Sequence, residues 1–213
     1  MINNLKLVVS GFPGTGKTTL VNAISSEFSL PIIQENMFQI GDLNRQLNIA
    51  IKEKRQKEIP GLIKKYCESF LEWDARRSAE YLEHQSFIAD RWEADLLDYW
   101  LLSSASFVGD FSKISTKLLK NLQENSKNID VCILTPLIEP FSNEKNEEGN
   151  TRTKGFTTHL RNIVTTVGIV KTFTKTTLIM LPSSKMNVDE RLDFVKKSLT
   201  KVNINQSNVK LKI

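Results

Sequence analysis

Residues 11–18 read GFPGTGKT and match the pattern G-x-x-x-x-G-K-[ST], which is the sequence signature of a phosphate-binding loop. With glycine at its ordinary frequency of ~7%, a chance match in a chain of this length has a probability on the order of one per cent. The apolar, β-branched residues 5–10 before the motif are typical of a buried strand, and residues 17–28 after it carry apolar side chains at helical spacing. Because strand, loop and helix follow in the order that such a loop requires, we expect the motif to bind phosphate.

The glycines of this loop would let the chain turn tightly with its amide groups pointing inward, toward phosphate oxygens at the start of a helix. Lys17 would reach the β- and γ-phosphates of ATP, the Thr18 hydroxyl would bind Mg²⁺, and the Thr19 hydroxyl would lie on the α-phosphate side. A glycine-rich turn that merely starts a helix is the alternative. The residues expected to bind the nucleotide are Gly11, Pro13, Gly14, Thr15, Gly16, Lys17, Thr18 and Thr19.

A chain of 213 residues is long enough for one α/β domain, and we expect a single domain with a lid at about residues 136–156. No stretch reaches the ~18 consecutive apolar residues of a membrane span, and the start lacks the layout of a signal peptide, so we expect a cytoplasmic protein without a membrane partner. The two cysteines lack metal-ligand spacing, which predicts buried thiols and argues against structural zinc. The net charge of +5 suits nucleic acid or polyphosphate equally and does not separate them.

Five apolar runs alternate with helical patterns along the chain. Such alternation predicts an α/β fold, with a five-stranded parallel sheet and helices on both faces in a three-layer sandwich. We also expect Pro60-Gly61 to break the chain and residues 202–213 to form a frayed or edge-pairing tail. The expected strands are residues 5–10, 30–34, 87–90, 129–135 and 177–181, and the helices are 17–28, one within 37–59, then 62–84, 93–104, 111–125, 157–173 and 188–199.

Three functional candidates sit at predicted carboxyl ends of strands, where open parallel sheets bind their ligands. They are the loop at Gly11, the carboxylate of Glu35 and the pair Asp90-Arg91. We therefore expect one cleft to hold them together. Arg76 and Arg77, within a long amphipathic helix, could face either water or a ligand, and the surface is the expected place.

The pair Asp90-Arg91 bears on the type of reaction. An aspartate after an apolar strand is where proteins with this loop place the group that holds Mg²⁺, directly or through water. In NTPases that hydrolyse the nucleotide, a glutamate usually follows this aspartate. An arginine at that position can instead stabilise charge on a transferring phosphoryl group or bind a substrate. The alternative is a strand end with a surface ion pair.

These motifs together resemble the P-loop small-molecule kinases and AAA-type ATPase domains. The likeness is to nicotinamide riboside kinase and, more distantly, to nucleoside and thymidylate kinases. It rests on GFPGTGKTTL, on Glu35 after the second strand and on IADRWEADLLDYW at residues 88–100, which supplies the Asp-Arg pair, Asp95 and Tyr99. A lid carrying arginine is also implied, and GNTR, ending at Arg152, resembles it. Trp92, in place of a small residue, departs from the pattern.

The resemblance implies in-line transfer of a phosphoryl group, in which positioning and charge neutralisation do most of the catalysis. Catalytic roles fall to Lys17, Glu35, Arg91 and Arg152, with Glu35 accepting the hydroxyl proton or anchoring the substrate. Thr18 and Asp90 would hold Mg²⁺. The residues expected to bind the acceptor are Glu35, Arg91, Asp95 and Arg161. Asp95 is open to a second interpretation as a helix cap, and Arg161 as an exposed helix charge.

The resulting hypothesis is an ATP-dependent kinase that moves the γ-phosphoryl group of Mg-ATP to a hydroxyl or phosphate of a nucleoside, riboside or similar small metabolite. A nucleotide-binding regulator or slow NTPase that uses the lid as a switch is the alternative. A nucleic-acid-linked ATPase rests on charge alone, so nucleic acid is not an expected partner. The oligomeric state stays open, with a homodimer as one option.

Overall fold

The computed structural model describes residues 4–103, 108, 111–136, 156–182 and 187–210. Five parallel strands form one sheet in the spatial order β2-β3-β1-β4-β5. The strands are β1 (Lys6–Ser10), β2 (Ile32–Ile33), β3 (Phe87–Asp90), β4 (Val131–Leu134) and β5 (Thr177–Met180). The helices are α1 (Lys17–Phe28), α2 (Phe38–Lys52), α3 (Ile59–Leu82), α4 (Glu93–Ser103), α5 (Phe111–Asn125), α6 (Phe156–Phe173) and α7 (Val188–Lys210), with the 3-10 helix η1 (Ser126–Asn128).

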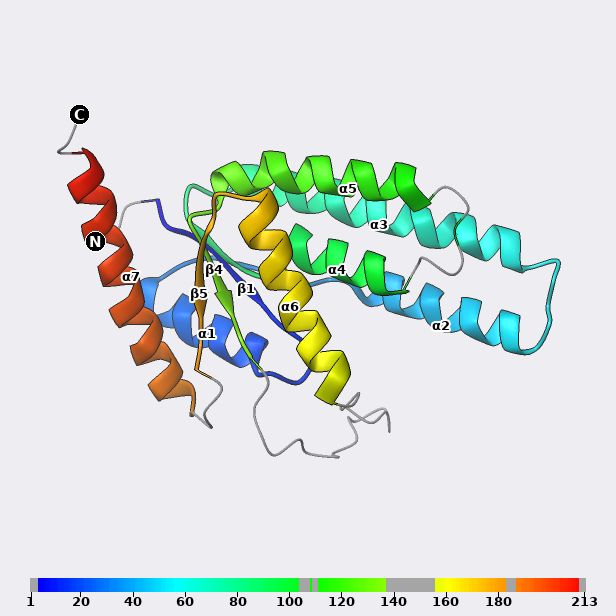
Figure 1. The fold of residues 1–213 in the computed structure, drawn as a ribbon, viewed down its shortest axis with the longest axis horizontal. Coiled ribbons are helices and arrows are strands. Elements are labelled where there is room, and N and C mark those ends of the chain that lie inside the picture. Colours follow the sequence, from blue (N-terminus) through cyan, green and yellow to red (C-terminus); the bar gives the residue numbers. More distant parts are fainter. Residues whose placement is uncertain (1–3, 104–107, 109–110, 137–155, 183–186, 211–213) are drawn as a thin grey trace.

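Helices cover both faces of the sheet, because its central strands are apolar on both sides (Figure 1). Leu7 and Val9 of β1 face the layer formed by α1 and α7, where Leu20 and Val195 complete one core cluster. Val8 faces the opposite layer, in which residues of α2 to α6 form the other cluster. The three-layer α/β sandwich with five parallel strands is therefore confirmed.

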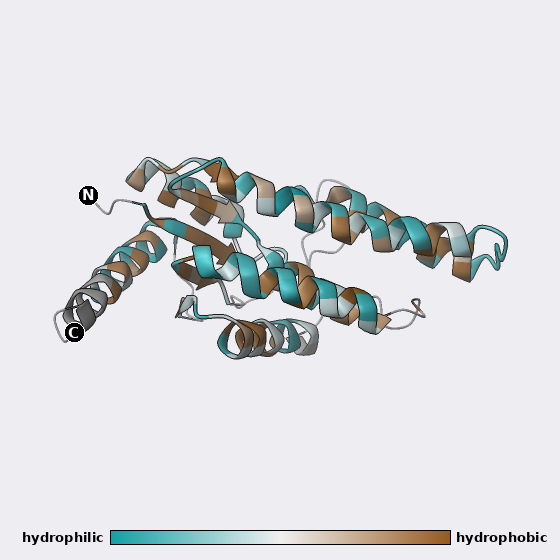
Figure 2. Ribbon diagram, turned by 90° about the horizontal axis from the view of Figure 1, so that it is seen from above, coloured by the Kyte–Doolittle hydropathy of each residue, from teal (hydrophilic) through white to brown (hydrophobic). Residues whose placement is uncertain are grey.

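Helices α2 and α3 form a pair that extends beyond the edge of the sheet (Figure 1). In Figure 2 the strands are brown and hydrophobic, and teal, hydrophilic residues lie along the surrounding helices. In the part of the chain that the structure describes, no helix has both the length and the apolar character needed to cross a membrane.

Two predictions are wrong, one about a break in the chain and one about its carboxyl-terminal segment. Pro60-Gly61 does not interrupt the chain but lies in the first turn of α3, where proline is tolerated because its missing N–H would have no helical partner. The turn comes earlier, around Lys54, which has a positive φ of 57°. The expected tail at residues 202–213 is helical as far as Lys210, since no glycine or proline interrupts α7 there.

Candidate active site

The loop of residues 11–16 connects β1 to α1, and close packing requires glycine at its first position. Gly11 has φ 140°, and a Cβ there would lie 2.3 Å from the Oγ1 of Thr135 and 2.5 Å from its carbonyl oxygen. A side chain at Gly11 would therefore push the loop away from the end of β4. Gly16, with φ 80° in the left-handed region, precedes the first residue of α1. Pro13 and Gly14 are exposed at the tip of the loop.

Lys17 lies along the inside of this loop. Its Nζ donates a hydrogen bond of 3.1 Å to the carbonyl oxygen of Phe12, and the residue is only 6% exposed. Burial, reinforced by the nearby Arg91 guanidinium, lowers the pKa of Lys17 to about 8. An anionic phosphate in the loop would relieve this cost by supplying the negative charge that a buried ammonium lacks.

Two side chains from distant elements fix the loop from outside. The hydroxyls of Thr15 and Thr135 lie 2.7 Å apart, and Thr135 also donates to the carbonyl of Ser10 at 2.9 Å. Arg191 of α7 donates from Nη1 to the carbonyl oxygen of Thr15 at 2.8 Å. The loop is thus tied to the end of β4 and to the last helix.

Thr18 and Asp90, the predicted magnesium ligands, are in direct contact. Strand β3 lies beside β1 with Asp90 in register with Val9, so its carboxylate faces the start of α1. The Oγ1 of Thr18 donates to Oδ2 of Asp90 at 2.6 Å, and the buried Oδ1 of Asp90 has no hydrogen-bond partner among the described residues. Hydroxyl and carboxylate oxygens are ligands that Mg²⁺ accepts, and it usually takes its remaining ligands from water and substrate phosphates. The two residues therefore fit a magnesium ion bound together with a nucleotide. Thr19 is exposed one residue further along α1.

Arg91 sits between two carboxylates. Its Nε lies 2.7 Å from Oε1 of Glu35, which follows β2, and its Nη1 lies 3.4 Å from Oδ1 of Asp95 in the first turn of α4. The side chain of Glu35 is 37% exposed, whereas that of Asp95 is 1% exposed. The structure therefore brings Glu35, Asp90 and the loop together, as the carboxyl-end rule predicts.

Asp95 also joins α4 to the phosphate loop. One oxygen accepts from the Ser10 hydroxyl at 2.6 Å and from the backbone N–H of Trp92 at 3.3 Å, and the other accepts from the N–H of Gly11 at 3.3 Å. The contact with Trp92 places Asp95 as a cap at the start of α4, as the second interpretation has it. Burial raises the pKa of the Asp95 carboxyl, although Arg91 works in the opposite direction.

Arg161 and Arg152 are the two predicted site residues that remain. Arg161 is an exposed residue of α6. Arg152 and almost all of the expected lid lie outside the described residues. Behind Arg161, Asn162 hydrogen-bonds the buried Asp98 of α4, so α6 is connected to the helix that carries Asp95.

Several residues that contact the site were missed at the level of sequence. Ser10 and Trp92 form a chain in which the indole Nε1 donates to Ser10 Oγ at 2.8 Å and Ser10 donates to Asp95. Thr135 ends the fourth apolar run, so the carboxyl-end rule could have found it. Nothing in the sequence marks Arg191. The prediction that Arg77 lies at the surface is wrong, because the residue is 1% exposed.

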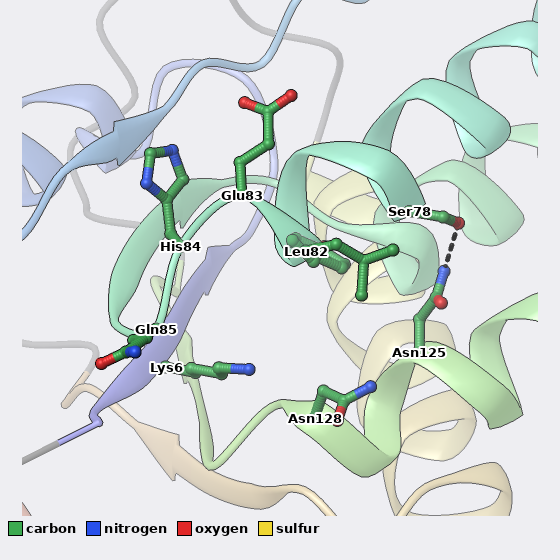
Figure 3. A pocket seen from close by; sticks show the side chains of 9 residues that line it. Lys6, Ser78, Leu82, Glu83, His84, Gln85, Asn125 and Asn128 are labelled. Atoms are coloured by element: carbon green, nitrogen blue, oxygen red, sulfur yellow. Dashed lines mark hydrogen bonds between the residues drawn. The ribbon is translucent and has the colours of Figure 1, made fainter.

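A separate pocket of about 440 Å³ lies at the opposite edge of the sheet, where β1 and β3 begin (Figure 3). Lys6 and Asn128 form part of its wall, and Tyr81 and Asn125 form another part. The last two hydrogen-bond the buried carboxylate of Glu93, at 3.0 and 2.8 Å. The pocket is therefore distant from the phosphate loop and borders a buried acid at the start of α4.

Glu93 is expected to make the stability of the protein depend on pH. Burial raises its pKa from 4.5 to about 7, so the folded state keeps a proton that the unfolded chain releases near pH 4.5. A raised folded-state pKa gives stability that is lost as pH rises, and the free energy of unfolding should fall by roughly 1–3 kcal/mol between pH 5 and pH 8. Glu93→Gln should reduce this slope in urea unfolding measured across that range.

The matched control for this experiment is Glu83→Gln, which changes an exposed carboxylate at the end of α3. Some slope should remain in Glu93→Gln, because burial also raises the pKa of Asp74 to about 6 and of Asp98 to about 7. A slope equal to that of the unaltered protein would contradict the prediction.

The comparisons with known proteins concern the family and the fold of the chain. A family model described as an AAA domain matches residues 6–178, whereas a search of curated protein sequences finds no match. Deoxyadenosine kinase from M. mycoides, solved with dCMP and a flexible dCDP as products, has a TM-score of 0.59 at 13% identity, covering 93% of this chain and 100% of that one. Thymidylate kinase from Candida albicans has a TM-score of 0.54 at 15% identity, covering 97% and 93%. The YorR protein from Bacillus subtilis, solved with phosphorylated GDP, has a TM-score of 0.52 at 15% identity, covering 94% and 97%. At these identities the likeness shows the shared fold.

Proposed function

The chain belongs to the AAA domain family, and we propose that within it the protein is a phosphotransferase. In this proposal it moves the γ-phosphoryl group of Mg-ATP to an acceptor that is a nucleoside, riboside or similar small metabolite. Lys17 and the amides of residues 11–16 bind the phosphates, and Thr18 and Asp90 hold Mg²⁺. The fold shared with the deoxyadenosine and thymidylate kinases supports this assignment.

The contact between Glu35 and Arg91 is the observation that carries the proposal. Their side chains meet at 2.7 Å at the ends of β2 and β3, beside the Thr18–Asp90 pair that faces the phosphate loop. A partly exposed carboxylate can accept a proton from an acceptor hydroxyl, and an adjacent guanidinium can stabilise the charge of the transferring phosphoryl group. Binding of the nucleotide by the loop does not by itself require this second pair. Arg152 and Arg161 would close over the phosphoryl group and exclude water.

The charges around Arg91 favour a hydroxyl of an uncharged acceptor over a phosphate. The guanidinium already faces two carboxylates, those of Glu35 and Asp95. A phosphate monoester beside Arg91 would be repelled by the negative charge of Glu35. Neutral nucleosides and ribosides should therefore be better acceptors than nucleoside monophosphates.

The assay that tests the function follows ADP release by a coupled reaction, with Mg-ATP and a panel of nucleosides, ribosides and nucleoside monophosphates. ADP that forms only when an acceptor is present supports phosphoryl transfer. Turnover that no acceptor changes, or tight nucleotide binding without turnover, would replace the proposal with the slow NTPase or regulator. Retention on DNA or RNA that falls steeply with salt would instead indicate a nucleic-acid-linked ATPase.

Glu35→Gln is expected to lower acceptor-dependent kcat by roughly 10²-fold, because the amide cannot take up the proton of the attacking hydroxyl. The affinity for ATP, measured by calorimetry, should change little, since Glu35 follows β2 and contacts Arg91 rather than the loop. Glu83→Gln, an exposed change directly after α3, is the matched control. Full activity in Glu35→Gln would remove the proposed role of this carboxylate while leaving phosphoryl transfer itself open to other residues.

A further inference from the structure

Helix α3 holds the two backbone segments that carry the proposed catalytic side chains. Its carboxyl-terminal half returns from the α2–α3 pair toward the sheet (Figure 1). There the indole Nε1 of Trp73 donates to the carbonyl oxygen of Glu35 at 2.8 Å, and Arg76 donates to that of Asn36 at 3.0 Å. One face of α3 thus contacts the backbone that follows β2.

Arg77 spans both strand ends. Its Nη2 lies 2.6 Å from the carbonyl oxygen of Gln34, 3.3 Å from that of Glu35 and 3.4 Å from that of Asp90. The first two carbonyls follow β2, and the third belongs to the last residue of β3. A single guanidinium nitrogen therefore connects the backbone that carries Glu35 to the backbone that carries Asp90 and Arg91.

The backbone at these two strand ends needs support. Asn36 has φ 47° and Arg91 has φ 65°, both in the left-handed region that residues with a side chain seldom adopt. Such conformations persist where surrounding contacts over-determine them, and they gather at functional sites. Around Asn36 those contacts come from α3, and at Arg91 they come from the carbonyl of Val9, which accepts its N–H at 3.0 Å.

Arg77 is buried, unlike an ordinary charged residue of the protein surface. The residue is 1% exposed, its guanidinium lies 4.7 Å from the centre of the Trp73 ring, and Nη1 lies 3.5 Å from Oε2 of Glu80. Taking an arginine out of water is costly unless its environment compensates for it. The carbonyl oxygens, the ring face and the partly exposed Glu80 supply part of that compensation, while the buried Nε and Nη1 have no hydrogen-bond partner among the described residues.

We propose that Arg77 is a positioning residue for phosphoryl transfer, which bridges the ends of β2 and β3 and holds Glu35 and Arg91 at the separation where their side chains pair. The assignment rests on the proposed function for its kinetic consequence, but the bridge itself is independent of it. The side chain of Arg77 contacts the backbone carbonyl of Asp90 but not the phosphate loop, the Thr18 hydroxyl or the Asp90 carboxylate. We therefore expect its loss to affect the acceptor side of the site more than the binding of the donor nucleotide.

Arg77→Lys tests the proposal because the lysine ammonium ends about one bond short of the Nη2 position and lacks the flat guanidinium face that lies against Trp73. We expect kcat to fall by roughly 10- to 100-fold, as small displacements of catalytic groups do, with the dissociation constant for ATP unchanged within about threefold. Lys65→Met, an exposed change on the same helix, is the matched control. An equal loss of donor affinity and kcat would overturn the proposal, since it would indicate a general disturbance of the fold.

A double-mutant cycle separates positioning from general destabilisation. If Arg77 acts through Glu35, Arg77→Lys should reduce kcat much less in a Glu35→Gln background than in the unaltered protein. Equal reductions in both backgrounds would overturn the proposal. Should Arg77→Lys fail to fold, Arg77→Gln gives the same comparison without burying an unpaired ammonium.

Amide hydrogen exchange supplies a readout that does not depend on activity. Exchange at residues 34–36 and 91–92 should speed up in Arg77→Lys by about tenfold or more, whereas the amides of β1 and β4 should keep their protection. If the protein phosphorylates no acceptor, the proposed function fails and this measurement still tests the bridge. Unchanged exchange at both strand ends would overturn the bridge even in an active kinase.

Discussion

Replacing Lys17 by Met is expected to abolish most phosphoryl transfer, lowering kcat/KM by roughly 10³-fold or more while the protein stays folded. Lys17 is the only cation whose Nζ lies inside the loop among the described residues, where it is held by the carbonyl of Phe12. That bond must break for Nζ to turn to the β- and γ-phosphates. The methionine keeps the length of the side chain but leaves the charge of the triphosphate without this partner.

The pH dependence of nucleotide binding provides the distinguishing measurement. Because burial lowers the pKa of Lys17 to about 8 in the free protein, a growing fraction of the side chain is neutral above that pH. A bound triphosphate favours the ammonium, so ATP binding should take up protons near pH 8, and affinity should weaken between pH 7 and pH 9. Lys17→Met should bind weakly and without this dependence.

Lys171→Met, which changes an exposed lysine near the end of α6, is the matched control for both measurements. Calorimetry in two buffers of different ionisation enthalpy reports the proton uptake directly. Strong ATP binding by Lys17→Met with an unchanged pH profile would show that the loop does not hold phosphate in the way its geometry indicates.

The sequence could predict the phosphate loop and the layering because both follow from local patterns. The motif at residues 11–18 specifies its own backbone, and five apolar runs between helical patterns specify a parallel sheet. The sequence could predict that Thr18 and Asp90 lie near each other, because the phosphate loop and Asp90 both come at carboxyl ends of strands. It could not predict the distance between the two side chains, because that depends on β3 lying beside β1, and strand order is decided by packing rather than by any one segment.

The side chains that hold the site together from a distance could not be predicted in the same way. Arg77 belongs to a charged, amphipathic helix, and the sequence does not distinguish it from its neighbour Arg76. In the structure Arg77 faces the sheet and is buried, whereas about half of the Arg76 side chain is exposed. Arg191 contacts Thr15 of the loop although the two residues are 176 positions apart in the sequence. Both depend on how α3 and α7 sit against the sheet, which hydrophobic spacing fixes only to within a turn or so.

Replacing Arg91 by Met should have two large effects that a second substitution can separate. Transfer should fall by roughly 10³-fold, the effect of removing an arginine that stabilises a transferring phosphoryl group. Stability should also fall by about 3–5 kcal/mol, because the Asp95 side chain, which is 1% exposed, would lose its charged partner. Glu35, which is partly exposed, can be hydrated instead.

The double variant Arg91→Met with Asp95→Asn should recover most of the lost stability but none of the lost transfer. An amide at position 95 can still accept hydrogen bonds from Ser10 or Gly11, and it needs no neighbouring charge. Urea unfolding and acceptor-dependent kcat, measured on both variants and on Asp95→Asn alone, give the two quantities separately. If the double variant regained transfer along with stability, Arg91 would act only by neutralising Asp95, and the group that stabilises the phosphoryl charge would have to lie elsewhere in the chain.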